Sequence, residues 1–397
     1  MDGMDAPEHR PLRVLMTTDT VGGVWQHSIE LARALGDWGH RVALAALGPA
    51  PSPRQRAEAR AVHGLSLHVR SGALEWMHEP WDEVRRSGDW LLALAARLRP
   101  DLVHLNQFAF GALPFAAPTL VVGHSCVLSW WQAVHGCAAP AAWDRYRAAV
   151  HDGLRGATAI GAPTRTMLDA LRRHHGIARD GHVLPNGRDP RRFVAAPKRP
   201  QVLSAGRLWD PAKNLESLRR AASALPPPWE VRVAGAAHGP DGQGTDTAPL
   251  LALGPLAPSA LARAYAGAAI YALPARYEPF GQTVLEAALS GCALVLGDIA
   301  SLRETWDGAA LFVAPDDHRT LGDTLARLAA DEPLRRDLAR AAQERAQHFT
   351  PTRMATAYLG VYTALCDDWA RHPPAAPPLG GPGRAPSRAL QAPVALP

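Results

Sequence analysis

Short apolar runs alternate with longer stretches of helical periodicity along the first half of the chain. Continuous apolar runs of strand length predict buried strands at residues 12–18, 41–47, 65–70, 101–105, 119–123, 157–162 and 181–184. Apolar residues at three- and four-residue spacing predict helices at residues 24–35, 81–98, 141–155 and 164–174. Strands that alternate with helices predict an α/β domain whose parallel sheet is covered on both faces.

The same alternation starts afresh in the second half of the chain. Apolar runs predict strands at residues 201–205, 230–234, 250–253, 268–273, 293–297 and 310–313. Helical periodicity follows at residues 214–224, 259–265, 282–290, 318–329, 333–347 and 352–369. Two such series predict two doubly wound, Rossmann-like domains with a cleft between them. Ligands of such sheets bind outside the carboxyl ends of the strands.

A change to loop composition separates the two series. Residues 186–190 read Asn-Gly-Arg-Asp-Pro, and the charged segment at residues 197–200 begins and ends with proline. A chain of 397 residues exceeds what one hydrophobic core usually supports. We therefore expect a first domain at residues 1–187 and a second at residues 188–351. The Pro/Gly/Ala-rich residues 371–397 are expected to form a disordered tail.

Composition narrows the class of protein without indicating an activity. Hydrophobic residues make up 47% of the chain and charged residues 20%, and no apolar run reaches the length of a membrane span. Residues 1–11 lack the apolar segment of a secretory signal. The net charge of +5 is explained as well by an arginine-rich composition as by attraction to phosphates or to an acidic membrane. Four scattered cysteines without metal-ligand spacing indicate a cytoplasmic setting, and peripheral contact with the inner face of the membrane stays open.

A glycine pair, Gly22–Gly23, lies in the turn between the first predicted strand and the first predicted helix. A Rossmann-like sheet binds anions at this position, because the helix N-terminus faces the ligand there. The chain lacks the G-x-G-x-x-G fingerprint, and Leu47-Gly48-Pro49 stands where a ribose-binding acid would follow the second strand. A dinucleotide cofactor is therefore disfavoured. The alternative is that the glycines serve turn geometry alone.

Two glutamates, Glu278 and Glu286, flank a turn and a helix start. Pro279–Gly281 form the turn, and the backbone N–H groups of residues 281–283 would face a negatively charged ligand. The carboxylates can accept strong hydrogen bonds from hydroxyl groups. A nucleotide-sugar, which is both an anion and a polyol, needs both kinds of contact. An ordinary helix start with two solvated acids is the alternative.

Three further polar residues follow predicted strands. His124 comes after the apolar run 119–123, and Arg207 and Lys213 come after the run 201–205. Each has a simpler interpretation, because histidines are often hydrogen-bonded structural residues and surface cations are usually solvated. The carboxyl ends of parallel strands meet at one edge of a sheet, so these residues and the two glutamates could share one cleft.

The order of these features resembles the retaining glycosyltransferases of family 4, which have the GT-B fold. The resemblance runs from about residue 13 to about residue 362. Its most specific part is residues 276–287, which include Glu278 and Glu286 separated by seven residues. Residues 206–208 (Gly-Arg-Leu), 213–214 (Lys-Asn) and 184–187 (Leu-Pro-Asn-Gly) add to it.

The resemblance implies a role for each site residue. A donor diphosphate would be held by Arg207, Lys213, the Gly22–Gly23 turn and the amides after Phe280, at Gly281, Gln282, Thr283 and Val284. It places Glu286 on the donor ribose and Glu278 on the hydroxyls of the donor sugar, with His124 approaching the sugar and the scissile bond. It implies that the last helix, about residues 352–370, crosses back and completes the first domain.

The implied chemistry is metal-independent transfer with retention of configuration, and the expected catalytic residues are His124, Glu278, Arg207 and Lys213. Departure of a sugar from a diphosphate builds negative charge, which two preorganised cations could stabilise in place of a metal. No cofactor is expected. The acid pair Asp316-Asp317 is interpreted as a helix cap. A glycosidase would use its two carboxylates as acid and nucleophile, but the cations favour a phosphate leaving group.

The acceptor side is less clear from the sequence. Tryptophans concentrate at residues 75–81 and at Trp130 and Trp131, and their faces could stack on sugar rings. Buried structural tryptophan is the alternative. The expected function is transfer of a hexose-type sugar from a nucleoside diphosphate sugar to a saccharide, lipid or small-molecule acceptor, with no nucleic-acid partner. A nucleotide-sugar epimerase on the same fold and a non-catalytic nucleotide-sugar-binding protein stay open.

Overall fold

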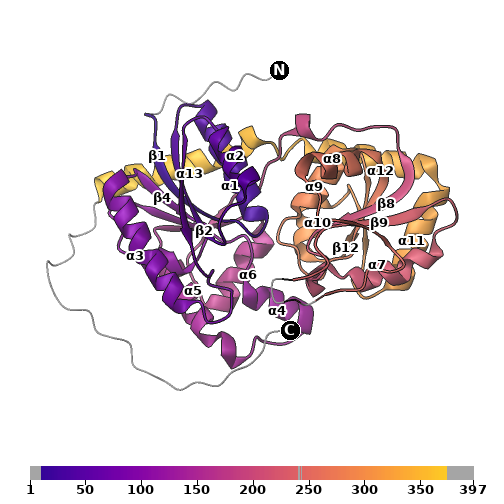
Figure 1. The fold of residues 1–397 in the computed structure, drawn as a ribbon, viewed down its shortest axis with the longest axis horizontal. Coiled ribbons are helices and arrows are strands. Elements are labelled where there is room, and N and C mark those ends of the chain that lie inside the picture. The colour runs from indigo at the N-terminus through magenta and orange to yellow at the C-terminus, as the bar shows by residue number, and fades with distance from the viewer. Residues whose placement is uncertain (1–9, 240–241, 243, 373–397) are drawn as a thin grey trace.

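The computed structural model describes residues 10–239, 242 and 244–372 and consists of two lobes, each built on a sheet (Figure 1). Most of the tail predicted to be disordered, from residue 373 onward, lies outside the described residues. The two residues of that tail that the structure describes end the final helix: Arg371 is its last residue, and the amide of His372 donates to the carbonyl of Asp368 over 2.9 Å.

The first lobe contains a seven-stranded sheet in the order β3-β2-β1-β4-β5-β6-β7. All of its neighbouring strands pair in parallel. The strands are β1 (Arg13–Asp19), β2 (Arg41–Gly48), β3 (Leu65–Ser71), β4 (Leu102–Leu105), β5 (Thr119–Val122), β6 (Ala159–Ala162) and β7 (His182–Val183). The helices are α1 (Gly23–Asp37), α2 (Pro53–Arg60), α3 (Trp81–Leu98), α4 (Val127–His135), α5 (Asp144–Gly156) and α6 (Arg165–His175), with short turns η1 (Ala109–Ala112) and η2 (Ala141–Trp143).

The second lobe contains a six-stranded parallel sheet in the order β10-β9-β8-β11-β12-β13. Its strands are β8 (Arg199–Ala205), β9 (Glu230–Ala234), β10 (Leu251–Gly254), β11 (Ala268–Leu273), β12 (Ala293–Gly297) and β13 (Leu311–Val313). Its helices are α7 (Leu215–Ala221), α8 (Pro258–Gly267), α9 (Gln282–Leu289), α10 (Ala300–Trp306), α11 (His318–Ala330) and α12 (Glu332–Ala346), with turns η4 (Pro211–Lys213) and η5 (Ala222–Ala224). Residues 184–198, which include η3 (Pro190–Arg192), form the linker between the two sheets.

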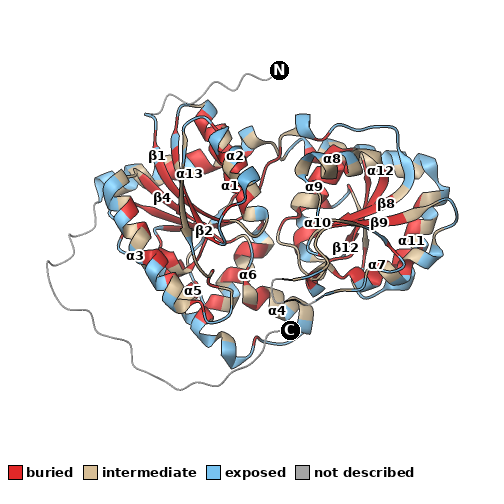
Figure 2. Ribbon diagram, viewed as in Figure 1, coloured by how far each residue is buried: buried red, intermediate tan, exposed pale blue. Residues whose placement is uncertain are grey.

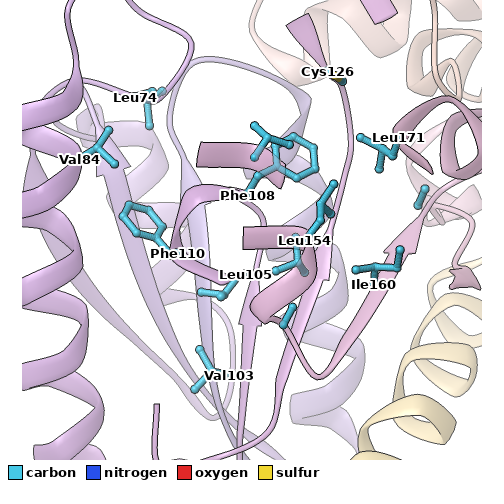
Figure 3. Packing of buried hydrophobic residues seen from close by; sticks show 14 of the residues in the cluster. Leu74, Val84, Val103, Leu105, Phe108, Phe110, Cys126, Leu154, Ile160 and Leu171 are labelled. Carbon is cyan, nitrogen blue, oxygen red and sulfur yellow. The ribbon is translucent and has the colours of Figure 1, made fainter. Parts of the chain in front are cut away.

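The central strands, such as β4, β5 and β11, are buried along their whole length because both faces of each sheet are covered. In β1, Val14 and Met16 pack into one core cluster and Leu15 packs into the other, so successive side chains serve opposite faces. The central strands of both sheets are buried, whereas the outer faces of the helices are exposed (Figure 2). The edge strands β3, β7 and β10 are partly exposed. On one face of the first sheet, Val103 and Leu105 of β4 pack in the same cluster as residues of η1, α3 and α5 (Figure 3). The predicted covered parallel sheets are confirmed.

The last helix, α13 (Pro351–Arg371), leaves the second lobe and runs along the first (Figure 1). Its residues Met354, Ala355, Tyr358, Leu359 and Tyr362 belong to the core cluster that also contains residues of α1 and β1. The helix therefore supplies one wall of the core of the first lobe.

Three α-helices within the described residues were missed by the pattern of apolar positions. In α2 only Ala59 is buried, so the helix has almost no apolar stripe, although a capping box between Ser52 and Gln55 marks its start. The helices α4 and α10 span nine and seven residues, too few for a clear period. The segment 197–200 was predicted to be linker, but β8 already begins at Arg199.

Candidate active site

A cavity of about 590 Å³ lies between the two lobes. Its first-lobe wall comes from the glycine turn, α1 and α2, and its second-lobe wall comes from α8, α9 and the segment before α8. Linker residues Arg188, Arg192 and Phe193 close the remaining side. Of the residues predicted for the donor site, Gly22 and Glu286 line this cavity from opposite lobes.

The glycine turn faces two other predicted site residues across the interlobe gap. A methyl group built on Gly23 would lie 3.2 Å from Oε1 of Gln282, and one built on Gly22 would lie 4.0 Å from a guanidinium nitrogen of Arg207. The amides of Val21 and Gly22 both donate to Oδ1 of Asp19, over 2.9 and 3.3 Å. Asp19, the last residue of β1, shapes the turn, and no sequence pattern marked it as a site residue.

Arg207 lies at the carboxyl end of β8, with its side chain 45% exposed. Its guanidinium donates to Oδ2 of buried Asp210 over 3.0 Å. The other carboxylate oxygen of Asp210 accepts from the Trp130 indole N–H of the first lobe over 3.0 Å. Trp130 and Arg207 therefore meet through one buried carboxylate, which the sequence analysis did not single out.

Lys213 and Glu278 form an ion pair of 2.7 Å and are 16% and 14% exposed. The other oxygen of Glu278 accepts from the Gly281 amide over 3.0 Å. The amide of Gly281, predicted to face an anion, thus donates to the neighbouring carboxylate. The structure thus brings together two residues to which the sequence assigned separate tasks.

Of the side chains around the start of α9, some pack into the second lobe and Gln282 faces the first lobe. Phe280 and Val284 pack in a core cluster of the second lobe, so only their backbone could contact a ligand. The Thr283 hydroxyl accepts from the hydroxyl of Tyr271 over 2.8 Å. Gln282 is the residue of this segment whose side chain approaches the glycine turn.

Glu286 is held by a buried arginine of the linker. Arg188 donates to Glu286 over 2.7 Å and to Glu30 of α1 over 3.1 Å, and Arg192 also pairs with Glu30 over 2.8 Å. The side chains of Arg188, Glu30 and Glu286 are 4%, 2% and 9% exposed. Arg188 lies in the loop-like segment 186–190, whose composition gives no signal for a site residue.

His124 is partly exposed just beyond β5. Its Nε2 lies 2.9 Å from Oδ1 of Asn106, and its ring lies 4.5 Å from the ring of His27. Burial lowers the pKa of His124 to about 4, so the imidazole is neutral near pH 7. Behind it, His27 contacts the Tyr358 hydroxyl of α13 over 3.3 Å.

Protonation of His104 at low pH should destabilise the protein. His104 is buried beside His27 and Tyr358, and its ring contacts the Tyr362 hydroxyl over 2.7 Å. Burial lowers the pKa of His104 to about 3, against about 6.5 in an unfolded chain. The unfolded chain therefore binds more protons between these values. The stability contributed by neutral His104 is complete above about pH 6.5 and is lost as the pH falls toward 3. At about pH 5 the expected loss is roughly 2 kcal/mol.

The measurement is the free energy of unfolding as a function of pH in wild type and His104→Gln. Glutamine cannot titrate, so between about pH 4 and 6 the free energy of unfolding should depend less steeply on pH. The decrease in slope should correspond to at most one proton bound on unfolding. His318→Gln, at an exposed position of α11, is the control and should keep the wild-type slope. Identical slopes in wild type and His104→Gln would refute the assignment. The titratable groups around His104 are His27, His124, Tyr358 and Tyr362.

The predicted acceptor tryptophans occupy two different environments. Trp130 reaches Asp210 in the second lobe. Trp131 packs against the first-lobe core and lies 4.4 Å from the ring of His135. Trp76 and Trp81 of the segment 75–81 also pack against that core, which agrees with the structural alternative. Trp130 is thus the predicted acceptor residue that contacts the opposite lobe.

Across the described part of the chain, no three His, Cys, Asp or Glu side chains gather as metal ligands would. The predicted capping role is confirmed for Asp317, whose side chain accepts from the Thr320 amide at the start of α11. It is wrong for Asp316, which pairs with Arg276. None of the helices in the described ranges is long and apolar enough to cross a membrane.

Comparisons with known proteins agree with this architecture. A model described as Glycosyltransferase Family 4 matches residues 21–192, and one described as Glycosyl transferases group 1 matches residues 199–331. The chain is therefore a glycosyltransferase, and the predicted GT-B fold is confirmed. A search of curated proteins found no significant match.

Solved structures share the fold at low sequence identity. Sucrose-phosphate synthase of Thermosynechococcus elongatus is 19% identical with a TM-score of 0.72, over 90% of this chain and 100% of that one. HepE of Anabaena in complex with UDP-glucose is 18% identical with a TM-score of 0.74, over 89% and 100%. A glycosyltransferase of Rickettsia africae is 15% identical with a TM-score of 0.69, over 90% and 99%.

Proposed function

We propose that the protein is a retaining, metal-independent hexosyltransferase. It moves a hexose-type sugar from a nucleoside diphosphate sugar to a saccharide, lipid or small-molecule acceptor. The observation that carries the proposal is the set of charged residues where the lobes meet: Arg207 opposite the glycine turn, and the Lys213–Glu278 pair. One structure with the same fold contains UDP-glucose, which supports a donor of this class.

The donor would lie along the interlobe cavity. Glu286, held by Arg188, would bind the ribose, and the space lined by Leu256 and Phe193 would take the base. The diphosphate would then lie near Gly22, within reach of Arg207. A nucleoside diphosphate fits a cavity of about 590 Å³ with polar groups at defined points.

The cations would supply the charge stabilisation that other transferases take from a metal. Negative charge grows on the leaving diphosphate, and preorganised cations in a water-poor site stabilise it strongly. Lys213 neutralises Glu278, which supports a role for this carboxylate in binding sugar hydroxyls and not as a nucleophile. We propose same-face attack, in which the donor phosphate helps to deprotonate the acceptor.

The acceptor would approach from the first lobe, where Trp130 reaches the opposite wall of the cleft. An aromatic face there suits a sugar ring. The four cysteines are unpaired, which supports a reducing compartment such as the cytoplasm, with peripheral contact at the membrane as a further proposal.

The test is a panel of nucleoside diphosphate sugars with purified protein in EDTA, with thermal shift and nucleotide release as readouts. A donor at 100 times its dissociation constant stabilises the folded state by about 2.7 kcal/mol, which a melting curve detects. We expect one donor to bind and to release its nucleotide in EDTA. Binding by no donor would contradict the proposal, and activity restored only by added metal would contradict metal independence. Conversion of the donor sugar without any acceptor would indicate an epimerase. Tight donor binding with no turnover across a broad library of acceptors would indicate a binding protein.

A further inference from the structure

Asn106 contacts the ring of His124 and is itself held rigidly. It follows β4, and its backbone amide donates to Oγ1 of Thr17 over 2.8 Å. Its side-chain Nδ2 donates to the backbone carbonyl of Thr17 over 2.7 Å. Only 8% of Asn106 is exposed, and the two hydrogen bonds to Thr17 hold it in place.

These contacts determine which way the Asn106 amide points. A backbone carbonyl can only accept a hydrogen bond, so the atom 2.7 Å from the Thr17 carbonyl must be the NH₂ group. The hydroxyl of Ser28, 3.5 Å away, agrees, because it donates its own proton to Thr18 and can accept from Nδ2. Oδ1 of Asn106 therefore faces His124.

The amide orientation in turn determines where His124 carries its proton. Oδ1 is an acceptor without a proton, so Nε2 of His124, 2.9 Å away, must be the protonated nitrogen. Burial keeps the imidazole neutral, because it lowers the pKa of His124 to about 4. The ring of His27 of α1 lies 4.5 Å from that of His124, and His104 of β4 is a titratable neighbour that interacts with it through charge. Burial also lowers the pKa values of both. A neutral ring protonated at Nε2 has its lone pair at Nδ1.

We propose that Asn106 is a positioning residue that holds His124 as the Nε2–H tautomer, so that Nδ1 accepts a hydrogen bond from a hydroxyl group of the donor sugar. The role toward the sugar rests on the proposed function, whereas the tautomer is a property of the ligand-free protein. In this arrangement His124 cannot donate to a phosphate oxygen from Nδ1. Protonation of Nδ1 would remove the acceptor and stop its contact with the sugar.

The tautomer is tested by long-range ¹⁵N–¹H correlation spectra of histidine-labelled, ligand-free protein. His124 is assigned from the signals that disappear in His124→Gln. At about pH 7 we expect Nε2 to show the shift of a protonated ring nitrogen and Nδ1 that of an unprotonated one. A proton on Nδ1, alone or in addition to Nε2, would overturn the inference.

Asn106→Asp tests the positioning role. A carboxylate next to Nε2 favours the imidazolium, so the pKa of His124 should rise by about 1–3 units. The acid limb of the pH profile of kcat/KM should move upward by the same amount. A spectrum recorded at about pH 5 should show both ring nitrogens protonated in at least half of the Asn106→Asp molecules, whereas most wild-type rings stay neutral at that pH. Gln347→Glu adds the same charge at an exposed position after α12 and should leave both readouts unchanged.

The two readouts separate failure of the inference from failure of the proposed function. An unmoved His124 spectrum in Asn106→Asp would overturn the positioning role, whether or not the enzyme turns over a donor. A shifted spectrum with an unmoved acid limb would overturn the role of Nδ1 toward the sugar. If no donor is turned over but the spectrum shifts, the proposed function fails and the tautomer stands.

Discussion

Replacing Arg207 with alanine should lower kcat by about 10²–10³-fold, because removal of one preorganised contact to developing charge costs about 3–4 kcal/mol of barrier. Arg207 lies where the glycine turn approaches the second lobe, and its guanidinium is anchored by Asp210. Its side chain is 45% exposed, so the substitution should leave the fold intact. The substitution should lower kcat more than it changes KM, because the negative charge on the diphosphate is greatest in the transition state.

The measurement is steady-state turnover of the donor identified by the panel, together with melting temperature. Arg207→Lys keeps the charge but loses the two-point geometry and should recover part of the activity. Arg340→Ala is the matched control, because this arginine lies on α12 and pairs with the exposed acids Asp337 and Glu344. A kcat of Arg207→Ala within threefold of wild type would remove Arg207 from the reaction.

Replacing Arg188 with methionine should lower the free energy of unfolding by about 3–5 kcal/mol. Arg188 lies between Glu30 of the first lobe and Glu286 of the second, and all three side chains are almost fully buried. Methionine fills similar volume without charge, so two carboxylates would stay buried with their shared cation removed. Glu30 keeps its ion pair with Arg192, but Glu286 loses the arginine it pairs with, and breaking a buried ion pair on one side costs this amount because the remaining charge is left uncompensated.

Melting curves provide the measurement, and for a domain of this size the loss should lower the melting temperature by about 6 °C or more. Arg336→Met is the control: its side chain is 78% exposed and pairs with an exposed glutamate, so its effect should stay below about 1 kcal/mol. Arg188→Lys should recover part of the stability because it restores the charge. Equal melting temperatures for Arg188→Met and Arg336→Met would show that the buried triad contributes no net stability.

Sequence patterns predicted the two sheets because their strands, such as β5 and β11, are buried on both faces and therefore read as continuous apolar runs. The patterns also placed Gly22, Arg207 and Glu278 beyond strand ends, where parallel sheets bind ligands. They missed α2, because that helix is polar on nearly every side and depends on its capping box.

The pairing of the site residues could not be predicted in the same way. Asn106 and His124 are 18 residues apart, and Trp130 and Asp210 are 80 residues apart and lie in different lobes. Local periodicity carries no information about which polar side chains meet, because such contacts depend on how strand ends and lobes are brought together. From the sequence, Lys213 and Glu278 were predicted to contact different parts of the donor. In the structure they form one ion pair.

The sequence by itself determined the fold class and the edge of each sheet where chemistry occurs, because apolar periodicity and strand order are local properties of the chain. The tertiary structure decided how the charges at that edge are paired. Arg188 became the cation shared by Glu30 and Glu286 only when the linker packed between the lobes. The tautomer of His124 was likewise decided by Asn106 on the neighbouring strand end, because a neutral imidazole takes its proton position from the hydrogen-bond partner that packing provides.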